Sequence, residues 1–161
     1  MILICYDGSD DAKAAIETAG RLFEGRPATV LTVWERFIDI LARTGAGFGF
    51  SASTADPDAV DRASEEAARA SADEGVGLAR AAGLNPQPRV RPRAGTIAEA
   101  IFEEAESDKA DVIVMGSRGL TGVKSFLLGS VSHAVLQHAD RPVVVVPSPA
   151  VAERRAADRH H

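Results

Sequence analysis

The sequence predicts an α/β domain built on a parallel β-sheet with helices on both faces. Short apolar runs, typical of buried strands, alternate along the chain with segments in which apolar residues recur at helical spacing. Strands that are apolar on both faces belong to parallel sheets that helices cover on each side. A chain of 161 residues is long enough to form one such domain with its own core.

The expected elements alternate regularly between strand and helix. In chain order we expect strand 1–6, helix 12–23, strand 28–34, helix 56–82, strand 88–93, helix 97–105, strand 111–116, helix 130–139 and strand 142–147. Ser9 lies where it caps the first helix, and Thr96 with Glu99 forms a capping box ahead of the third. Gly75 and Gly77 are expected to weaken the last turns of the second helix. Prolines are expected to weaken the third strand, because proline cannot donate to a ladder.

Two segments do not follow this alternation. Residues 35–56 form a long connection with a Gly- and Phe-rich centre, and connections of that length are usually functional or mobile. The segment 148–161 is charged and shows no apolar period, so we expect a flexible tail. The sequence therefore predicts one domain over residues 1–147, followed by that tail.

Composition and charge exclude several classes of function. The formal net charge of −5 argues against nucleic-acid binding, which requires a basic face. The single cysteine, Cys5, excludes an intrachain disulfide framework, fits a reducing compartment and is interpreted as a packing residue. The opening "MILICYDGSD" does not resemble a signal peptide, and no apolar run approaches the roughly 20 residues that span a bilayer. We therefore expect a cytoplasmic protein that contacts neither nucleic acid nor membrane.

The stretch "GSRGLTGVKSFLLGS" (116–130) is the most unusual part of the sequence. Its glycines follow the spacing G-x2-G-x9-G-S, formed by Gly116, Gly119, Gly129 and Ser130. Glycines directly after a strand let the chain turn tightly and expose backbone N–H groups. A helix that begins at Gly129 and Ser130 directs its free N–H groups and its dipole at an anion. The spacing therefore predicts a phosphate site, which would share one crevice with the polar loop after the first strand if those two strands are neighbours.

Other ligand motifs do not fit. "GVKS" (122–125) lacks the Gly-Lys pair of a Walker loop, and "GAGFGF" (45–50) ends in Phe where a dinucleotide fingerprint requires glycine. His133 and His138 are five residues apart, so they do not share a helix face as metal ligands at i and i+4 do. We therefore expect neither a dinucleotide site nor a metal site made of protein side chains.

Three features of the sequence resemble the universal stress protein family, and in particular its ATP-binding branch. They are the opening "YDGS" (6–9), the G-x2-G-x9-G-S spacing and the segment "GSVSHAVLQHADRPVVVVP" (129–147). The resemblance covers residues 1–147, except much of 35–56. It implies a Rossmann-like, adenine nucleotide alpha hydrolase-like fold with strand order 3-2-1-4-5. It also implies that ATP, which we expect to bind with Mg²⁺, lies across the first and fourth strands.

The same resemblance implies nucleotide contacts at the ends of the strands. Adenine and ribose contacts are implied for Tyr6, Asp7, Gly8, Val33, Met115 and Gly116, and phosphate contacts for Arg118, Gly119, Gly129, Ser130 and Val131. Asp7 also suits a turn, and Ser130 also suits a helix cap. Both residues therefore have a structural interpretation beside the functional one.

Three hypotheses for the function follow from these observations. The first is an ATP-binding regulatory module of the stress response that acts on an unidentified protein partner, with at most slow ATP hydrolysis. The second is an adenylating enzyme on the same fold, although such enzymes carry Ser-Gly-Gly-x-Asp-Ser where this chain has "YDGSDD" (6–11). The third is a dimeric interaction protein that binds no nucleotide, which the complete glycine motif disfavours. We prefer the first, because no spacing indicates a catalytic Ser-His-Asp or Cys-His set.

The last strand predicts a homodimer. In the order 3-2-1-4-5 it lies at the sheet edge, and residues 143–146 are four consecutive valines. An exposed apolar edge favours pairing with another chain, and a two-fold partner would place the same strand alongside in antiparallel register. The family resemblance implies the same arrangement. Alternatively, Pro142 and Pro147 with a collapsed tail protect the edge of a monomer.

Overall fold

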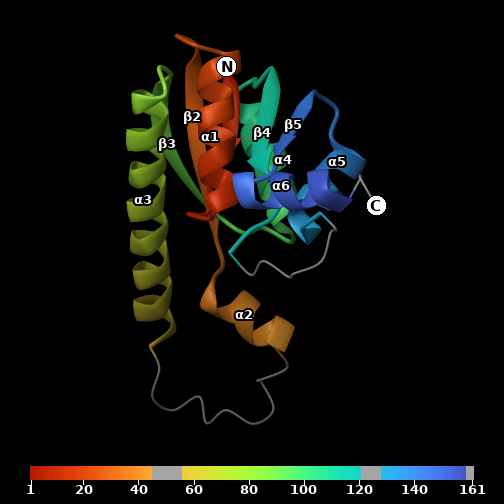
Figure 1. Cartoon of the computed structure of the whole chain (residues 1–161). Coiled ribbons are helices and arrows are strands. Elements are labelled where there is room, and N and C mark those ends of the chain that lie inside the picture. Colours follow the sequence, from red (N-terminus) through yellow and green to blue (C-terminus); the bar gives the residue numbers. More distant parts are fainter. Residues whose placement is uncertain (45–55, 121–127, 159–161) are drawn as a thin grey trace.

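The computed structural model describes residues 1–44, 56–120 and 128–158 and contains a five-stranded sheet in the order β3-β2-β1-β4-β5 (Figure 1). Every neighbouring pair of strands is parallel. The strands are β1 (Ile2–Cys5), β2 (Pro27–Trp34), β3 (Asn85–Pro92), β4 (Val112–Gly116) and β5 (Val143–Val146). The predicted single α/β domain and its strand order are confirmed.

Helices cover both faces of the sheet. The described helices are α1 (Asp10–Leu22), α2 (Phe37–Thr44), α3 (Pro57–Ala81), α4 (Ile97–Ser107), α5 (Ser130–His138) and α6 (Pro149–Asp158). Helices α1 and α3 bury their apolar residues against one face, and α4 and α5 bury theirs against the other. None of the helices in the described part of the chain is both long and apolar enough to cross a membrane.

Alternation along the strands divides the core into two layers. Ile2, Ile4 and Tyr6 face α1 and α3, whereas Leu3 and Cys5 face α4 and α5. This division follows from the two-residue period of a strand, whose successive side chains point to opposite faces. The face to which a residue points also decides whether its side chain reaches the crevice at the carboxyl ends of the strands.

The third strand is longer than its prolines suggested. Asn85 N donates to Arg26 O and Arg93 N donates to Trp34 O, so the odd-numbered residues of β3 direct their N–H groups at β2. In a parallel ladder the alternate residues direct theirs away. The prolines at 86, 88 and 92 occupy those alternate positions, where no ladder bond is lost. The expected weakening is therefore wrong, and the prolines instead protect this edge of the sheet from further pairing.

Two helices lie in segments for which the sequence predicted none. Helix α2 occupies part of the 35–56 connection, where the Phe37 backbone N donates to Asp61 Oδ1 of α3 at 2.6 Å; residues 45–55 lie outside the described part. Helix α6 occupies most of the expected flexible tail, and the buried Val151 anchors it. Most of the segment expected as a flexible tail is therefore helical. One buried side chain makes no apolar period, which is why the sequence pattern did not show this helix.

The glycines of α3 allow a test of helix packing. A Cβ built on Gly75 would lie 2.8 Å from Val30 Cγ1 and 2.9 Å from Tyr6 Cδ1, whereas one built on Gly77 meets nothing within 4 Å. We predict that Gly75→Ala lowers the free energy of unfolding by about 1–3 kcal/mol through overpacking. The matched control Gly77→Ala is predicted to raise it by about 0.5–1 kcal/mol, because alanine favours the helix. Urea unfolding measures both, and equal effects of the two changes would contradict this packing.

Candidate functional site

The loops that follow β1 and β4 lie side by side. Strands β1 and β4 are neighbours in the sheet, and the strand order reverses between them. Ser9 Oγ lies 3.4 Å from the Arg118 carbonyl oxygen, to which it donates. A Cβ built on Gly119 would lie 2.7 Å from Asp7 Oδ2, so the second loop passes directly over the first. The predicted shared crevice is therefore present at the carboxyl ends of the strands, the usual ligand position in such sheets.

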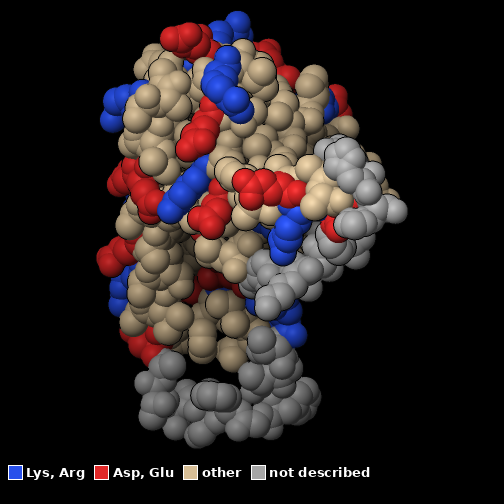
Figure 2. Space-filling model, in the orientation of Figure 1, with Lys and Arg blue, Asp and Glu red and all other residues tan. Residues whose placement is uncertain are grey.

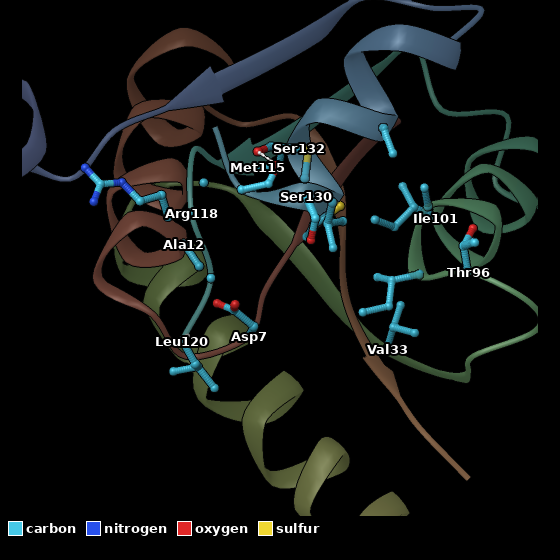
Figure 3. Close-up of a pocket in the computed structure, with 18 of the residues that line it drawn as sticks. Asp7, Ala12, Val33, Thr96, Ile101, Met115, Arg118, Leu120, Ser130 and Ser132 are labelled. Atoms are coloured by element: carbon cyan, nitrogen blue, oxygen red, sulfur yellow. Dashed lines mark hydrogen bonds between the residues drawn. The ribbon is translucent and has the colours of Figure 1, made fainter. Parts of the chain in front are cut away.

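A cavity of about 680 Å³ opens between these loops, β2 and the helices α4 and α5. Its wall includes every residue predicted to contact nucleotide except Gly8, namely Tyr6, Asp7, Val33, Met115, Gly116, Arg118, Gly119, Gly129, Ser130 and Val131. In Figure 3 Asp7 lies on one side of the cavity and Val33 with Ile101 on the other, with Met115 and Ser130 between them. One side of the cavity is thus apolar, and the other combines a carboxylate with a helix start.

The first turn of α5 presents backbone N–H groups to this cavity. Gly129 is the N-cap residue, and no side chain among the described residues caps the helix. The Gly129 N–H donates to the Ser117 carbonyl oxygen at 2.8 Å, so it is not available to a ligand. Ser130 and Val131 follow in the first turn, where backbone N–H groups lack partners within the helix. Ser130 itself does not cap the helix, and the helix start forms a partial positive charge at the cavity wall.

The loop after β1 is shaped by an aspartate and a glycine. Asp7 Oδ1 accepts from Ser9 N at 3.0 Å, which closes a local turn and leaves the exposed carboxylate beside Gly119. Gly8 has a φ of 83°, a left-handed conformation that favours glycine. Gly8 therefore serves the turn, and Asp7 combines the turn role with a place on the cavity wall.

Two predicted contacts have side chains that leave the cavity. The Tyr6 hydroxyl donates to Glu74 Oε1 of α3 at 2.8 Å, on the opposite face of the sheet from Cys5. Burial and the hydrogen bond to Glu74 raise the pKa of Tyr6. Figure 3 shows the Arg118 guanidinium directed away from Asp7 and Ser130. In this structure both residues border the cavity through atoms other than these polar groups.

The first glycine of the motif serves packing. A Cβ built on Gly116 would lie 2.7 Å from the carbonyl carbon of Asp11 and 2.9 Å from Ala12 N. A side chain at this position would therefore displace the first turn of α1 from the end of β4. Gly116 lets α1 and β4 approach closely, and this approach brings the two loops together.

The cavity also contains a charged cluster that the sequence did not indicate. Glu35 Oε1 pairs with Arg93 Nη1, and Glu35 Oε2 lies 3.1 Å from Arg43 Nη2 of α2. Burial opposes ionisation of Glu35, but hydrogen bonds from Arg93 and Arg43 outweigh burial and lower its pKa. Glu35 and Arg93 directly follow β2 and β3, and their side chains continue the alternation of those strands between the two faces of the sheet. This two-residue period could have indicated from the sequence that both side chains lie on the cavity side. Within the described residues, no group of three or more His, Cys, Asp or Glu side chains is placed to hold a metal ion.

The fold and the crevice define a doubly wound α/β domain with a ligand site at the switch point of its sheet. The chain belongs to the universal stress protein family, whose family model matches residues 1–147. A universal stress protein of Thermus aquaticus, from the 3′ region of the QAH/OAS sulfhydrylase gene, is 38% identical over 147 residues. That match covers 90% of this chain and 96% of the relative.

Solved structures share this fold. Protein MJ0577, a universal stress protein of Methanocaldococcus jannaschii, superposes with a TM-score of 0.71 at 24% identity, over 91% of this chain and 94% of that one. A universal stress protein family structure from Arabidopsis thaliana with AMP bound has a TM-score of 0.62 at 20% identity, covering 92% of each chain. Other family structures were solved in complex with dAMP and with cAMP.

The reactivity of the Cys5 thiol tests the environment of this residue in the cavity wall. Burial, and secondarily the charge of Asp7, raise the pKa of Cys5 to about 12. At pH 8 the reactive thiolate is therefore scarce, and we predict that iodoacetamide modifies the folded protein about a hundredfold or more slowly than free cysteine. The rate should rise with pH and should become normal in urea. Mass spectrometry follows the reaction, and a normal rate in the folded protein would contradict the raised pKa of Cys5.

Proposed function

We propose that this chain is an ATP-binding universal stress protein, a cytoplasmic regulatory module whose nucleotide state controls contacts with a protein partner. The observation that carries the proposal is the first turn of α5, which has no side-chain cap and faces a cavity beside Gly119. Such a helix start is a ready anion site. The AMP, dAMP and cAMP complexes of related structures support an adenine nucleotide as the ligand.

The cavity wall suits the three parts of a nucleotide. Val33 and Met115 provide an apolar surface for the base. The exposed carboxylate of Asp7 can accept hydrogen bonds from ribose hydroxyls. Gly119 and the N–H groups of Ser130 and Val131 can donate to phosphate oxygens.

The chemistry of the wall favours binding over catalysis. In the part of the wall that the structure describes, the carboxylates belong to Asp7 and Glu35, and Glu35 is held by two arginines. Mg²⁺ retains several waters and takes phosphate oxygens as ligands, so one carboxylate is enough to accompany it. Asp7 is therefore the side chain that would face a bound Mg²⁺. ATP hydrolysis would then be slow, because among the described wall carboxylates Glu35 is paired with arginines and Asp7 accompanies the metal ion.

Calorimetry with AMP and with Mg²⁺-ATP tests the nucleotide site. We expect a dissociation constant of about 1 μM, which corresponds to about −8 kcal/mol. Gly129→Val should abolish binding and keep the fold. The first added carbon would lie at a tolerable 3.4 Å from Arg118 Cα and Ser117 O. We expect the further methyl groups to obstruct the proposed phosphate site. Gly77→Val, at an exposed position of α3, is the matched control, and this variant should bind both nucleotides normally.

Two results would contradict the proposal. Absence of heat with either nucleotide at millimolar concentration would exclude an adenine nucleotide site. Normal binding by Gly129→Val would show that the phosphates lie elsewhere.

We further propose a homodimer through β5. The carbonyl oxygens of Pro142 and Val146 accept from Ile113 N of β4 at 3.0 Å and from Ser117 N, directly after β4, at 2.8 Å. The alternate residues Val143 and Val145 therefore direct their N–H and carbonyl groups away from β4, along a free edge. Prolines protect the opposite edge at β3, so β5 is the edge open to pairing.

A pair of proline variants tests this interface. Val145→Pro removes an N–H that faces away from β4, and we predict that it converts a dimer into a monomer of 16.9 kDa in sedimentation experiments. Val90→Pro makes the same change at an outward position of β3 and should leave the dimer intact. A wild-type chain that sediments as a monomer, or a Val145→Pro variant that remains dimeric, would contradict the proposed interface.

A further inference from the structure

Ser117 connects four elements of the fold although it contributes nothing to the cavity wall. Its side chain is fully buried, and its backbone N–H donates to Val146 O of β5 at 2.8 Å. Its hydroxyl donates to Asp11 Oδ2 of α1 at 2.6 Å. Its carbonyl oxygen accepts from Gly129 N at 2.8 Å and from Ser132 Oγ at 2.9 Å, both at the start of α5. One residue thus joins α1, the end of β4, β5 and α5.

Asp11 is a buried carboxylate that the proposed nucleotide contacts do not use. It lies in the first turn of α1 and is 5% exposed. A buried carboxylate is unfavourable unless hydrogen bonds and local dipoles compensate it. The Ser117 hydroxyl and the amino-terminal end of α1 supply this compensation. The bond also fixes Ser117, because the hydroxyl can satisfy the carboxylate from one position only.

We propose that Asp11 and Ser117 are positioning residues for the phosphate group of the nucleotide, which rests on the proposed function. Asp11 holds the Ser117 side chain, and the Ser117 carbonyl then fixes Gly129 and Ser132 in place. This sets the distance between Gly119 on one loop and the N–H groups of Ser130 and Val131. A hydrogen bond to phosphate weakens steeply when donor and acceptor are misplaced, so this distance determines phosphate affinity.

This role differs measurably from a general contribution to folding. On the apolar side of the cavity, Val33 and Ile101 belong to β2 and α4, which these hydrogen bonds of Ser117 do not join. Weakening the hydrogen bonds of Asp11 and Ser117 should therefore weaken AMP binding and leave adenosine binding almost unchanged. If these residues served folding alone, the same change would weaken the binding of both ligands equally or of neither.

The experiment measures AMP and adenosine affinities for Asp11→Ala, Asp11→Asn and Thr29→Val by calorimetry. Thr29→Val is the matched control, because Thr29 Oγ1 also donates to a carboxylate, Asp108 Oδ2 at 2.5 Å, away from the cavity wall. Asp11→Ala should weaken AMP binding by about tenfold, because a charge-assisted contact to the phosphate is misplaced. It should weaken adenosine binding by less than about threefold. Asp11→Asn should retain wild-type affinity, since its amide oxygen still accepts from Ser117. If Asp11→Ala does not fold, Ser132→Ala removes one bond to the Ser117 carbonyl and should shift the AMP-to-adenosine ratio in the same direction.

Amide hydrogen exchange provides a readout that does not depend on nucleotide. In Asp11→Ala the Gly129 amide should exchange faster, whereas in Thr29→Val it should not. Equal loss of AMP and adenosine affinity, or unchanged exchange at Gly129, would overturn the positioning role. If the wild-type chain binds neither ligand, the proposed function fails, and exchange at Gly129 still decides whether Asp11 holds the start of α5.

Discussion

The hydrogen bond from the Ser117 hydroxyl to the Asp11 carboxylate is the contact on which the geometry of the crevice depends. It fastens the start of α1 to the end of β4, at a point where Gly116 allows the two backbones to touch. The same serine then binds the start of α5 through its carbonyl oxygen. Two helix amino termini are thereby held next to each other by one buried residue. We propose that this attachment fixes the polar side of the shared crevice.

The two sides of the crevice are built by different means. The apolar side includes strand residues such as Leu31 and Val33, which belong to the core layer below it. The polar side consists of loops, where the Asp7 carboxylate lies beside Gly119 and where α5 begins. Beyond Val33, the arginines that hold Glu35 add charges of both signs to the wall. On the face of the molecule that carries α1 and α3, acidic and basic side chains are interspersed over the described residues (Figure 2).

Much of the fold was predictable because strand and helix periods are strong local signals. The caps at Ser9 and Thr96 were predictable for the same reason, since a cap acts over three residues. The directions of the Tyr6 and Arg118 side chains were not, because strand parity and loop geometry become visible only in three dimensions. The Glu35 cluster joins residues that follow β2 and β3 to Arg43 of α2. Strand periodicity could indicate the face on which Glu35 and Arg93 lie, but not that these distant residues pair with each other. Helix α6 was missed because a single buried residue, Val151, leaves no periodic signal.

The central claim is that the loop at Gly119 and the first turn of α5 together bind the phosphate of an adenine nucleotide. The most direct measurement is an amide NMR titration of the isotope-labelled protein with AMP. The largest saturable shifts should fall on Gly119, Ser130 and Val131, because their N–H groups gain a charged acceptor. Shifts centred on the outer edge of β3, or no saturable shift at these three amides, would contradict it.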